Sequence, residues 1–345
     1  MSVGIVTLAK HEHDFISQWI EYHYKLGFSH FYILVDNITE KQKDYVIEEQ
    51  FKQCVSFIHT NDADIEFYKV SLEYEPQHLS GILHELLNSK IVNTDIIKEK
   101  WVTAIGMDQY FYLNNNITIQ EYLNQIEEKC TQIIVPWSFC FFNNNNSKFD
   151  NILENCKSYK NIYGWVGHSN GLVRTCNLSK LNLNSHSFES KTPQQKVFII
   201  DEYYIMPSCL DTHSFFNIVQ HKLNNLPFDK INISSFHIFL RNVNEYFIKP
   251  RLCWNCKNKN NDDDNNNYFY NLSLSIKNNS SIEKVNGRGV NETRNELLEK
   301  QIELKFPKLE ITNGSEHYDM LILNQLNKHG VQKEDFEVWK TNFFT

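Results

Sequence analysis

Residues 3–37 read VGIVTLAKHEHDFISQWIEYHYKLGFSHFYILVDN and combine two apolar strands with an amphipathic helix. Val3–Leu8 is a short apolar run of the kind found in buried strands. Phe31–Val35 is a second such run, and Gly27 stands before it where a helix C-cap is expected. The segment between them, Asp14–Lys25, predicts a helix because its apolar side chains recur on one face, at Phe15, Ile16, Trp19, Ile20 and His23. The stretch therefore predicts one β-α-β unit.

The same alternation continues along the first 140 residues. Further helices are predicted over 40–51, Ser80–Val92 and Ile119–Glu128, and further strands over Cys54–Ile58, Trp101–Ile105 and Gln132–Trp137. Strands that alternate with helices in this way predict an α/β fold, with a mainly parallel central sheet flanked by helices.

The remaining chain divides into two less regular parts. Residues 141–250 are mixed, and we assign them with 1–140 to a single domain, residues 1–250. Residues 251–345 form a C-terminal extension, with an Asn/Asp-rich loop and helices predicted over Asn291–Leu304 and Asp319–Leu326.

Polar residues that follow the predicted strands are the first candidates for a binding site, because ligands bind at the carboxyl ends of strands in such sheets. These residues are Lys10, Asp36, Asn37, His59, Asp108 and the residues that follow Trp137. No GxGxxG or GxxxxGK[ST] motif follows any strand, which argues against dinucleotide and P-loop sites. No GxSxG motif occurs, which argues against an α/β-hydrolase.

Asp108 follows Gly106 and Met107 directly after a predicted central strand. A carboxylate there can hold a divalent cation together with diphosphate oxygens, and a neutral histidine nitrogen can complete such a shell. An aspartate in this position is also a common turn or helix-capping residue. The spacing alone leaves both interpretations open.

The bulk composition limits the partners. The net charge of −8 gives the chain no general attraction for nucleic acid or anionic membranes. We see no signal peptide and no apolar run of about 18 residues, so we expect no membrane span. We expect a cytoplasmic location. The Asn-rich composition is typical of some protists and large DNA viruses, and a viral protein would lie in the host cytoplasm or the virion.

Four segments of the chain resemble glycosyltransferase family 92 and related family 2-like enzymes of the GT-A type. A fifth match lies between them, and together they cover roughly residues 3–249. They are His11–His23 continuing through Lys25–Ile33 to Asp36-Asn37, Trp101–Phe111, Val135–Phe139, Leu172–Arg174 with His186–Phe188, and Ile233–Asn242 with Glu245–Phe247. The resemblance implies the GT-A (Rossmann-like) nucleotide-diphospho-sugar transferase fold, with residues 1–140 as its nucleotide-sugar-binding half and 141–250 as its acceptor half.

The resemblance also implies roles for single residues. Asp108 matches the second Asp of the family's DxD motif, and His237 matches a late histidine, so both are expected to bind Mn²⁺ or Mg²⁺. The nucleotide-sugar donor, expected to be UDP-linked, is assigned to Asp108 and to the residues Lys10, Asp36, Asn37 and Arg241. The glycan or glycoprotein acceptor and its sugar are assigned to Trp137 and His186.

Two departures from the family pattern bear on activity. Gly106 replaces the first Asp of DxD, and Gln109 replaces the following Glu. Three alternatives remain open: Asp108 and His237 hold the ion with the diphosphate, the enzyme needs no metal, or the chain is an inactive sugar- or nucleotide-binding protein.

Family 92 enzymes invert the anomeric centre, which implies a carboxylate base for the acceptor hydroxyl. The sequence does not select this base, and its candidates are Asp150, Glu189, Asp201, Glu202 and Asp211. The resemblance implies transfer of galactose or another hexose.

Overall fold

The computed structural model describes residues 1–35, 45–61, 63–64, 85–126, 128–140, 158–159, 169–182, 187–190, 194–199, 202–207, 231–238, 270, 272–274, 276–278, 302–303 and 317–343. The strands are β1 (Val3–Ala9), β2 (His30–Val35), β3 (Val55–His59), β4 (Trp101–Ala104), β5 (Gln109–Leu113), β6 (Gln132–Cys140), β7 (Ser158–Tyr159), β8 (Ser169–Arg174), β9 (Leu178–Asn182), β10 (Ser187–Ser190), β11 (Gln194–Ile199), β12 (Glu202–Pro207), β13 (Ile233–Ile238) and β14 (Ile302–Glu303).

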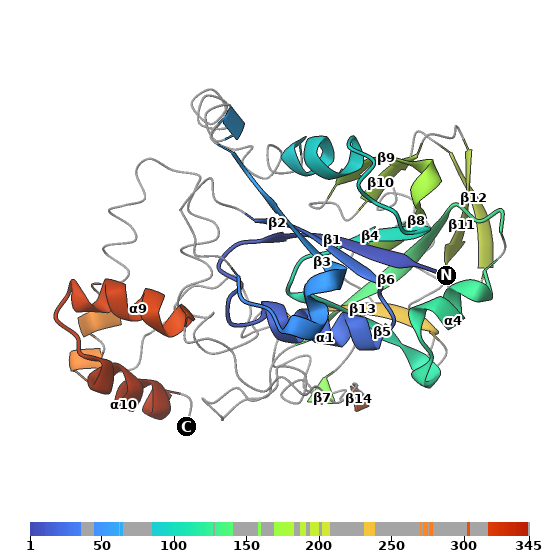
Figure 1. Cartoon of the computed structure of the whole chain (residues 1–345). Helices are drawn as coiled ribbons and strands as arrows, with labels where there is room; N and C mark the ends of the chain where they lie inside the picture. The colour runs from blue at the N-terminus through green and yellow to red at the C-terminus, as the bar shows by residue number, and fades with distance from the viewer. Residues whose placement is uncertain are drawn as a thin grey trace.

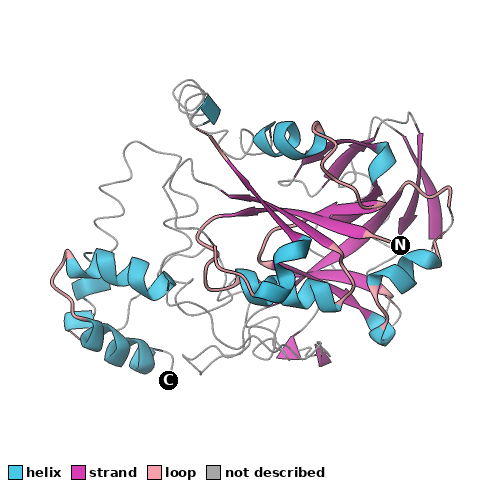
Figure 2. Cartoon of the chain, in the orientation of Figure 1, coloured by secondary structure: helices cyan, strands magenta, loops and turns pink. Residues whose placement is uncertain are grey.

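The helices are fewer than the strands in the described part of the chain (Figure 2). The α-helices are α1 (Ile16–Lys25), α4 (Ile119–Asn124), α9 (His317–Asn327) and α10 (Lys333–Phe343), and the shorter helical turns are η1 (Glu49–Cys54), η3 (Asn88–Val92), η4 (Asn114–Asn116) and η6 (Thr175–Asn177).

A mixed sheet forms the centre of the molecule, with its main strands in the order β12-β11-β6-β8-β4-β1-β2-β3 (Figure 1). Strands β3, β2, β1 and β4 are mutually parallel, as the β-α-β alternation predicts. Strand β8 then lies antiparallel between β4 and β6. The prediction of an α/β protein with helices around a sheet is confirmed, and the sheet is mixed because β8, β12 and β5 run against their neighbours.

Two apolar cores pack on opposite faces of this sheet. Alternate residues of β1 and β4 point to each face, because successive strand residues face opposite sides. One core takes Ile5 and Trp101 together with the buried side chains of α1 and α4. The other takes Val6 and Val102 together with Leu86, Leu87 and Ile91 beside η3. Helices α1 and α4 thus cover one face and η3 covers the other (Figure 1).

Helix α1 follows its sequence pattern closely. Every apolar residue of its predicted inner face is buried, and Trp19 is fully buried. The helix ends at Gly27, whose φ of 96° lies in the left-handed region that glycine adopts without strain. The apolar stripe and the glycine together set the helix and its end.

Several predicted elements differ from the structure. The predicted helix 40–51 is wrong in its described part, since residues 45–48 are not helical and η1 begins only at Glu49. The centroids of the Tyr45 and His13 rings lie 4.3 Å apart, and this tertiary contact overrides local helix propensity. The predicted helix Asn291–Leu304 is wrong at its end, where Ile302 and Glu303 pair with β7. The predicted helix at Asp319–Leu326 is confirmed as α9.

Candidate functional site at the ends of β1 and β4

The candidate site lies where the sheet order reverses around β1. Strand β1 pairs with β2 on one side and with β4 on the other. The chain adds β2 and β3 on one side of β1 and then crosses back to add β4 on the other side. Such a switch point leaves a crevice at the carboxyl ends of the two strands, which is where α/β sheets bind ligands. The backbone N–H of Ile105 donates to the carbonyl of Val6 at 3.2 Å, so the two strand ends lie side by side.

Two residues leave β1 at this edge. Lys10 is half-buried directly after the strand, and His11 is buried. His11 has a φ of 56°, and a non-glycine residue held in this region is uncommon and clusters at functional sites. The sequence pointed to Lys10 but gave no signal for the conformation of His11.

Asp108 lies in a tight turn after β4. The backbone N–H of Gln109 donates to the carbonyl of Gly106 at 3.0 Å, which closes the turn. The side-chain carbonyl of Gln109 accepts a second bond from the Gly106 N–H at 3.3 Å. Gln109 is almost fully buried and holds the turn from the interior of the protein, whereas Asp108 remains partly exposed.

Helix α1 holds the strand that follows this turn. The indole N–H of Trp19 donates to the carbonyl of Gln109 at 2.9 Å, and the hydroxyl of Tyr22 donates to the carbonyl of Phe111 at 2.5 Å. His23 accepts a longer bond of 3.4 Å from the Phe111 N–H. Strand β5 was not predicted, although its Tyr110-Phe111-Tyr112-Leu113 run has the aromatic character of a strand.

His23 is a neutral core residue. Its Nδ1 lies 2.9 Å from the carbonyl of Trp19, which can only accept, so Nδ1 carries the proton and Nε2 faces the Phe111 N–H. Burial lowers the pKa of His23 to about 3, and the bond to Trp19 offsets only part of this effect. The residue therefore serves as a structural link and has no charge at neutral pH.

Strand β13 brings His237 to the turn. It pairs antiparallel with β5, in a register that places His237 opposite Gln109, and parallel with β6, where His237 lies opposite Phe139. Because Asp108 is the neighbour of Gln109, this register brings two residues that are 129 positions apart in the chain into contact.

Asp108 and His237 form a direct pair. The Nε2 atom of His237 lies 2.9 Å from a carboxylate oxygen of Asp108, and the side chains are 15% and 21% exposed. Adjacent ligands of an octahedral Mg²⁺, each at about 2.1 Å, are about 3.0 Å apart. The two atoms can thus take neighbouring positions on one cation, with the metal replacing the Nε2 proton. Within the described residues, no third His, Cys, Asp or Glu completes a ligand cluster.

The orientation of His237 favours metal binding over base catalysis. Its Nδ1 atom is buried, so the nitrogen that a base would use for an incoming hydroxyl does not face solvent. Its Nε2 atom faces the carboxylate, as a cation ligand would.

Gly106 leaves room that the Asp108 side chain uses. A Cβ atom built on Gly106 would lie 2.7 Å from a carboxylate oxygen of Asp108, closer than Cβ contacts allow. The carboxylate therefore packs over the bare backbone of Gly106. A side chain at position 106 would therefore compete with the Asp108 carboxylate for this space.

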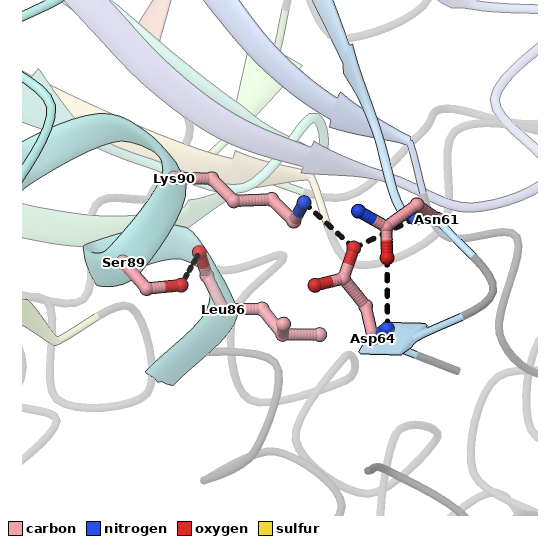
Figure 3. Close-up of polar contacts among 5 residues, drawn as sticks. All are labelled: Asn61, Asp64, Leu86, Ser89 and Lys90. Carbon is pink, nitrogen blue, oxygen red and sulfur yellow. Dashed lines mark hydrogen bonds and ion pairs between the residues drawn. The ribbon is translucent and has the colours of Figure 1, made fainter. Parts of the chain in front are cut away.

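A second polar cluster lies after β3 (Figure 3). The side chain of Asn61 accepts from the Asp64 N–H at 2.9 Å, and the carboxylate of Asp64 accepts from the Asn61 N–H at 2.7 Å. Lys90 reaches across from η3 to the same carboxylate at 2.6 Å. The cluster fixes η3 over the sheet, and Lys90 is already paired with Asp64.

The other predicted site residues are placed only in part. Trp137 lies in β6, where its backbone is in register with Ser235. Asp36, Asn37, His186 and Arg241 lie outside the described residues, as do the candidate bases Asp150, Asp201 and Asp211. Glu189 lies in β10.

Glu202 begins the edge strand β12 and is exposed. Four strand spacings separate β12 from β4, which is about 19 Å. This separation argues against Glu202 as the base next to Asp108.

Comparisons with known proteins add no assignment to this geometry. No model of a protein family matches the sequence, and no curated protein matches it. Across the described ranges, no helix is long and apolar enough to cross a membrane.

Proposed function

We propose that the protein is a GT-A glycosyltransferase that moves a sugar, galactose or another hexose, from a nucleotide-diphosphate donor to a glycan or glycoprotein. The observation that carries this proposal is the Asp108–His237 pair, 2.9 Å apart at the carboxyl end of β4. The strand order β3-β2-β1-β4 supports it, because it matches the first four strands of the doubly wound order, which binds nucleotides at the switch point between β1 and β4.

In this proposal Asp108 and His237 hold a divalent cation, Mn²⁺ or Mg²⁺. The cation, when bound, supplies positive charge to the diphosphate as it leaves the sugar. The pair provides two ligands at a spacing that fits one ion, and the donor's diphosphate oxygens and water complete the shell. Lys10, which leaves β1 at the same crevice, is placed to favour an anionic donor.

The remaining predicted site residues keep the roles that the resemblance implies. Asp36 and Asn37 are proposed to contact the nucleotide and Arg241 the diphosphate, with His186 on the acceptor side together with Trp137 of β6. The base that deprotonates the acceptor is left unassigned. A uridine diphosphate sugar, such as a UDP-hexose, is the donor class to test first.

The test is release of nucleoside diphosphate from a panel of nucleotide sugars, with Mn²⁺, with Mg²⁺ and with chelator. We expect metal-dependent release by the wild type and a loss of about 100-fold in Asp108→Asn and His237→Gln. Asp95→Asn is the matched control, because Asp95 is exposed with a φ of 53° that asparagine tolerates. Equal release by all three variants would falsify the assignment of the pair.

A second candidate function follows from Gly106. A chain that lacks the first acid of DxD can retain donor binding without turnover, as a sugar- or nucleotide-binding protein. The same panel separates the two functions. Donors that raise the melting temperature without any release of diphosphate favour the binding protein.

A further inference from the structure

Strand β6 changes partner along its length. It pairs with β8 from Gln132 to Pro136, and with β13 from Trp137 to Cys140. Strand β8 is antiparallel to β6, and β13 is parallel to it. The pairing of β6 thus changes from β8 to β13 between Pro136 and Trp137, and we call this point the fork. On the far side of this fork β13 also pairs with β5, the strand that follows Asp108.

One side-chain hydrogen bond crosses the fork. The Nδ2 atom of Asn170, at the start of β8, donates to the hydroxyl of Ser235 in β13 at 2.6 Å. Both residues are fully buried, and the two strands share no backbone pairing in the described sheet. The bond therefore links β13 directly to the main sheet at the point where backbone pairing passes from one strand to the other.

The buried pair is not explained by stability alone. The Oδ1 atom of Asn170 is buried and has no hydrogen-bond partner among the residues that the structure describes. A buried acceptor that is left unsatisfied is destabilising, and two apolar groups of the same shape can be equally stable. A polar pair in this place is better suited to fixing one position of β13 than to increasing the stability of the fold.

The arrangement that it fixes includes His237. Ser235 and His237 are two positions apart in β13, so their side chains point to the same face of the strand. His237 meets Asp108 only if β13 keeps its register with β5, where Ser235 lies opposite Phe111 and His237 opposite Gln109. A shift of one residue would turn His237 to the other face.

We propose that Asn170 is a positioning residue, whose hydrogen bond to Ser235 closes the fork in β6 and holds His237 against Asp108. The importance of this pair for catalysis rests on the proposed function. The geometry itself can be tested in the protein without donor or metal.

The experiment uses the full chain with ¹⁵N-labelled histidine and follows the Nε2-bound proton of His237 by NMR, assigned by its absence in His237→Gln. The test variant is Asn170→Leu/Ser235→Ala, which removes both polar partners and leaves no new orphan. We expect loss of the protected proton signal, a melting temperature within a few degrees of wild type, and Mn²⁺–UDP binding weaker by about tenfold.

Two further variants control for general loosening of the core. Ser235→Thr keeps the hydroxyl and is expected to retain the His237 signal. Thr103→Val removes a different buried hydroxyl, whose 2.6 Å bond to the Gly171 carbonyl joins β4 to β8 without involving β13. It is expected to leave His237 unchanged.

The proposal is overturned if the double variant folds and keeps the His237 signal. It is also overturned if Thr103→Val loses that signal. If the double variant does not fold, Asn170→Thr replaces it, because its short side chain does not span the fork, and an unchanged signal there overturns the proposal. If the signal behaves as expected but the wild type binds no metal–nucleotide complex, the proposed function fails while the positioning role stands.

Discussion

The indole N–H of Trp19 donates to the backbone carbonyl of Gln109 across 2.9 Å, and this bond joins the first helix to the turn that carries Asp108. Both residues are buried, and Gln109 also closes the turn through its backbone and side chain. The position of the Asp108 carboxylate thus depends on packing between α1 and β5, which is formed by residues about 90 positions apart.

The first prediction concerns this link. Trp19→Phe removes the bond that the indole donates to the buried Gln109 carbonyl, so the free energy of unfolding should fall by about 1–3 kcal/mol from this cause, with an additional cavity cost. Urea denaturation measures the change. Trp339→Phe, in α10, is the comparison, and its effect on donor binding should be negligible. Trp19→Phe should weaken donor binding, and unaltered binding would contradict the link to Asp108.

The second prediction concerns Gly106. Gly106→Ala places a methyl group where one oxygen of the Asp108 carboxylate now packs, so the carboxylate must move from its present position beside His237. We expect metal-dependent donor binding to be lost with little change in stability, because Gly106 does not need the left-handed backbone region. Calorimetric titration with Mn²⁺ and UDP checks the first part. Gly4→Ala is the control, since a Cβ added there would lie 3.1 Å from the Glu99 carboxylate and would not meet Asp108, and the variant should bind normally.

The third prediction concerns pH. The folded pKa of His23 is about 3, well below its unfolded value of 6.5, so between these values the unfolded chain binds a proton that the folded chain does not. The free energy of unfolding should therefore fall as the pH decreases from 6.5 towards 3, by at most about 1.4 kcal/mol per pH unit. It should be fully regained above pH 6.5.

Urea midpoints measured from pH 4 to pH 8 test this sign. His23→Gln should be less stable than wild type at pH 8 but should show a flatter pH profile below 6.5. His59→Gln, at an exposed histidine, should keep the wild-type profile. A steep profile that survives in His23→Gln assigns the effect to other groups.

The fourth prediction compares two glycines in left-handed conformations. Gly27 has a φ of 96°, and a Cβ added there would overlap the Gln120 side chain. Gly330 has a φ of 72°, and a Cβ added there would lie 3.5 Å from the Lys277 ammonium, which is an ordinary contact. Alanine at Gly330 should cost about 1–2 kcal/mol from backbone strain alone. Alanine at Gly27 should cost more, because Gln120 must also move and give up its bond to the Gly27 carbonyl. Equal costs in thermal denaturation would contradict the contact.

The local elements were predictable because they depend on local patterns. The apolar runs of β1, β2, β3 and β4 and the stripe of α1 appear where the sequence places them. The insertion of β8 could not be predicted, because its antiparallel pairing depends on strands about 40 and 70 residues away. Helix α10 was missed, although Phe336 and Trp339 show the helical spacing of its buried side.

The candidate site was predictable only in part. Asp108 and His237 were expected from the family resemblance, and the structure places them in contact. The supporting residues carry no signal in a single sequence. Gln109 and Asn170 act through buried polar bonds to distant segments, and a buried polar residue looks like a surface residue in sequence.

The separation of Asp108 and His237 by 129 positions affects how the site is made during synthesis. Strands β1 to β4 can associate as soon as they emerge from the ribosome, but β13 arrives more than a hundred residues later. A nascent chain that ends before His237 can thus hold most of the parallel sheet and still lack one of the two proposed cation ligands. Competence to bind the metal–nucleotide complex would then report on completion of this domain during translation, and a fluorescent nucleotide analogue could follow it on stalled chains of increasing length.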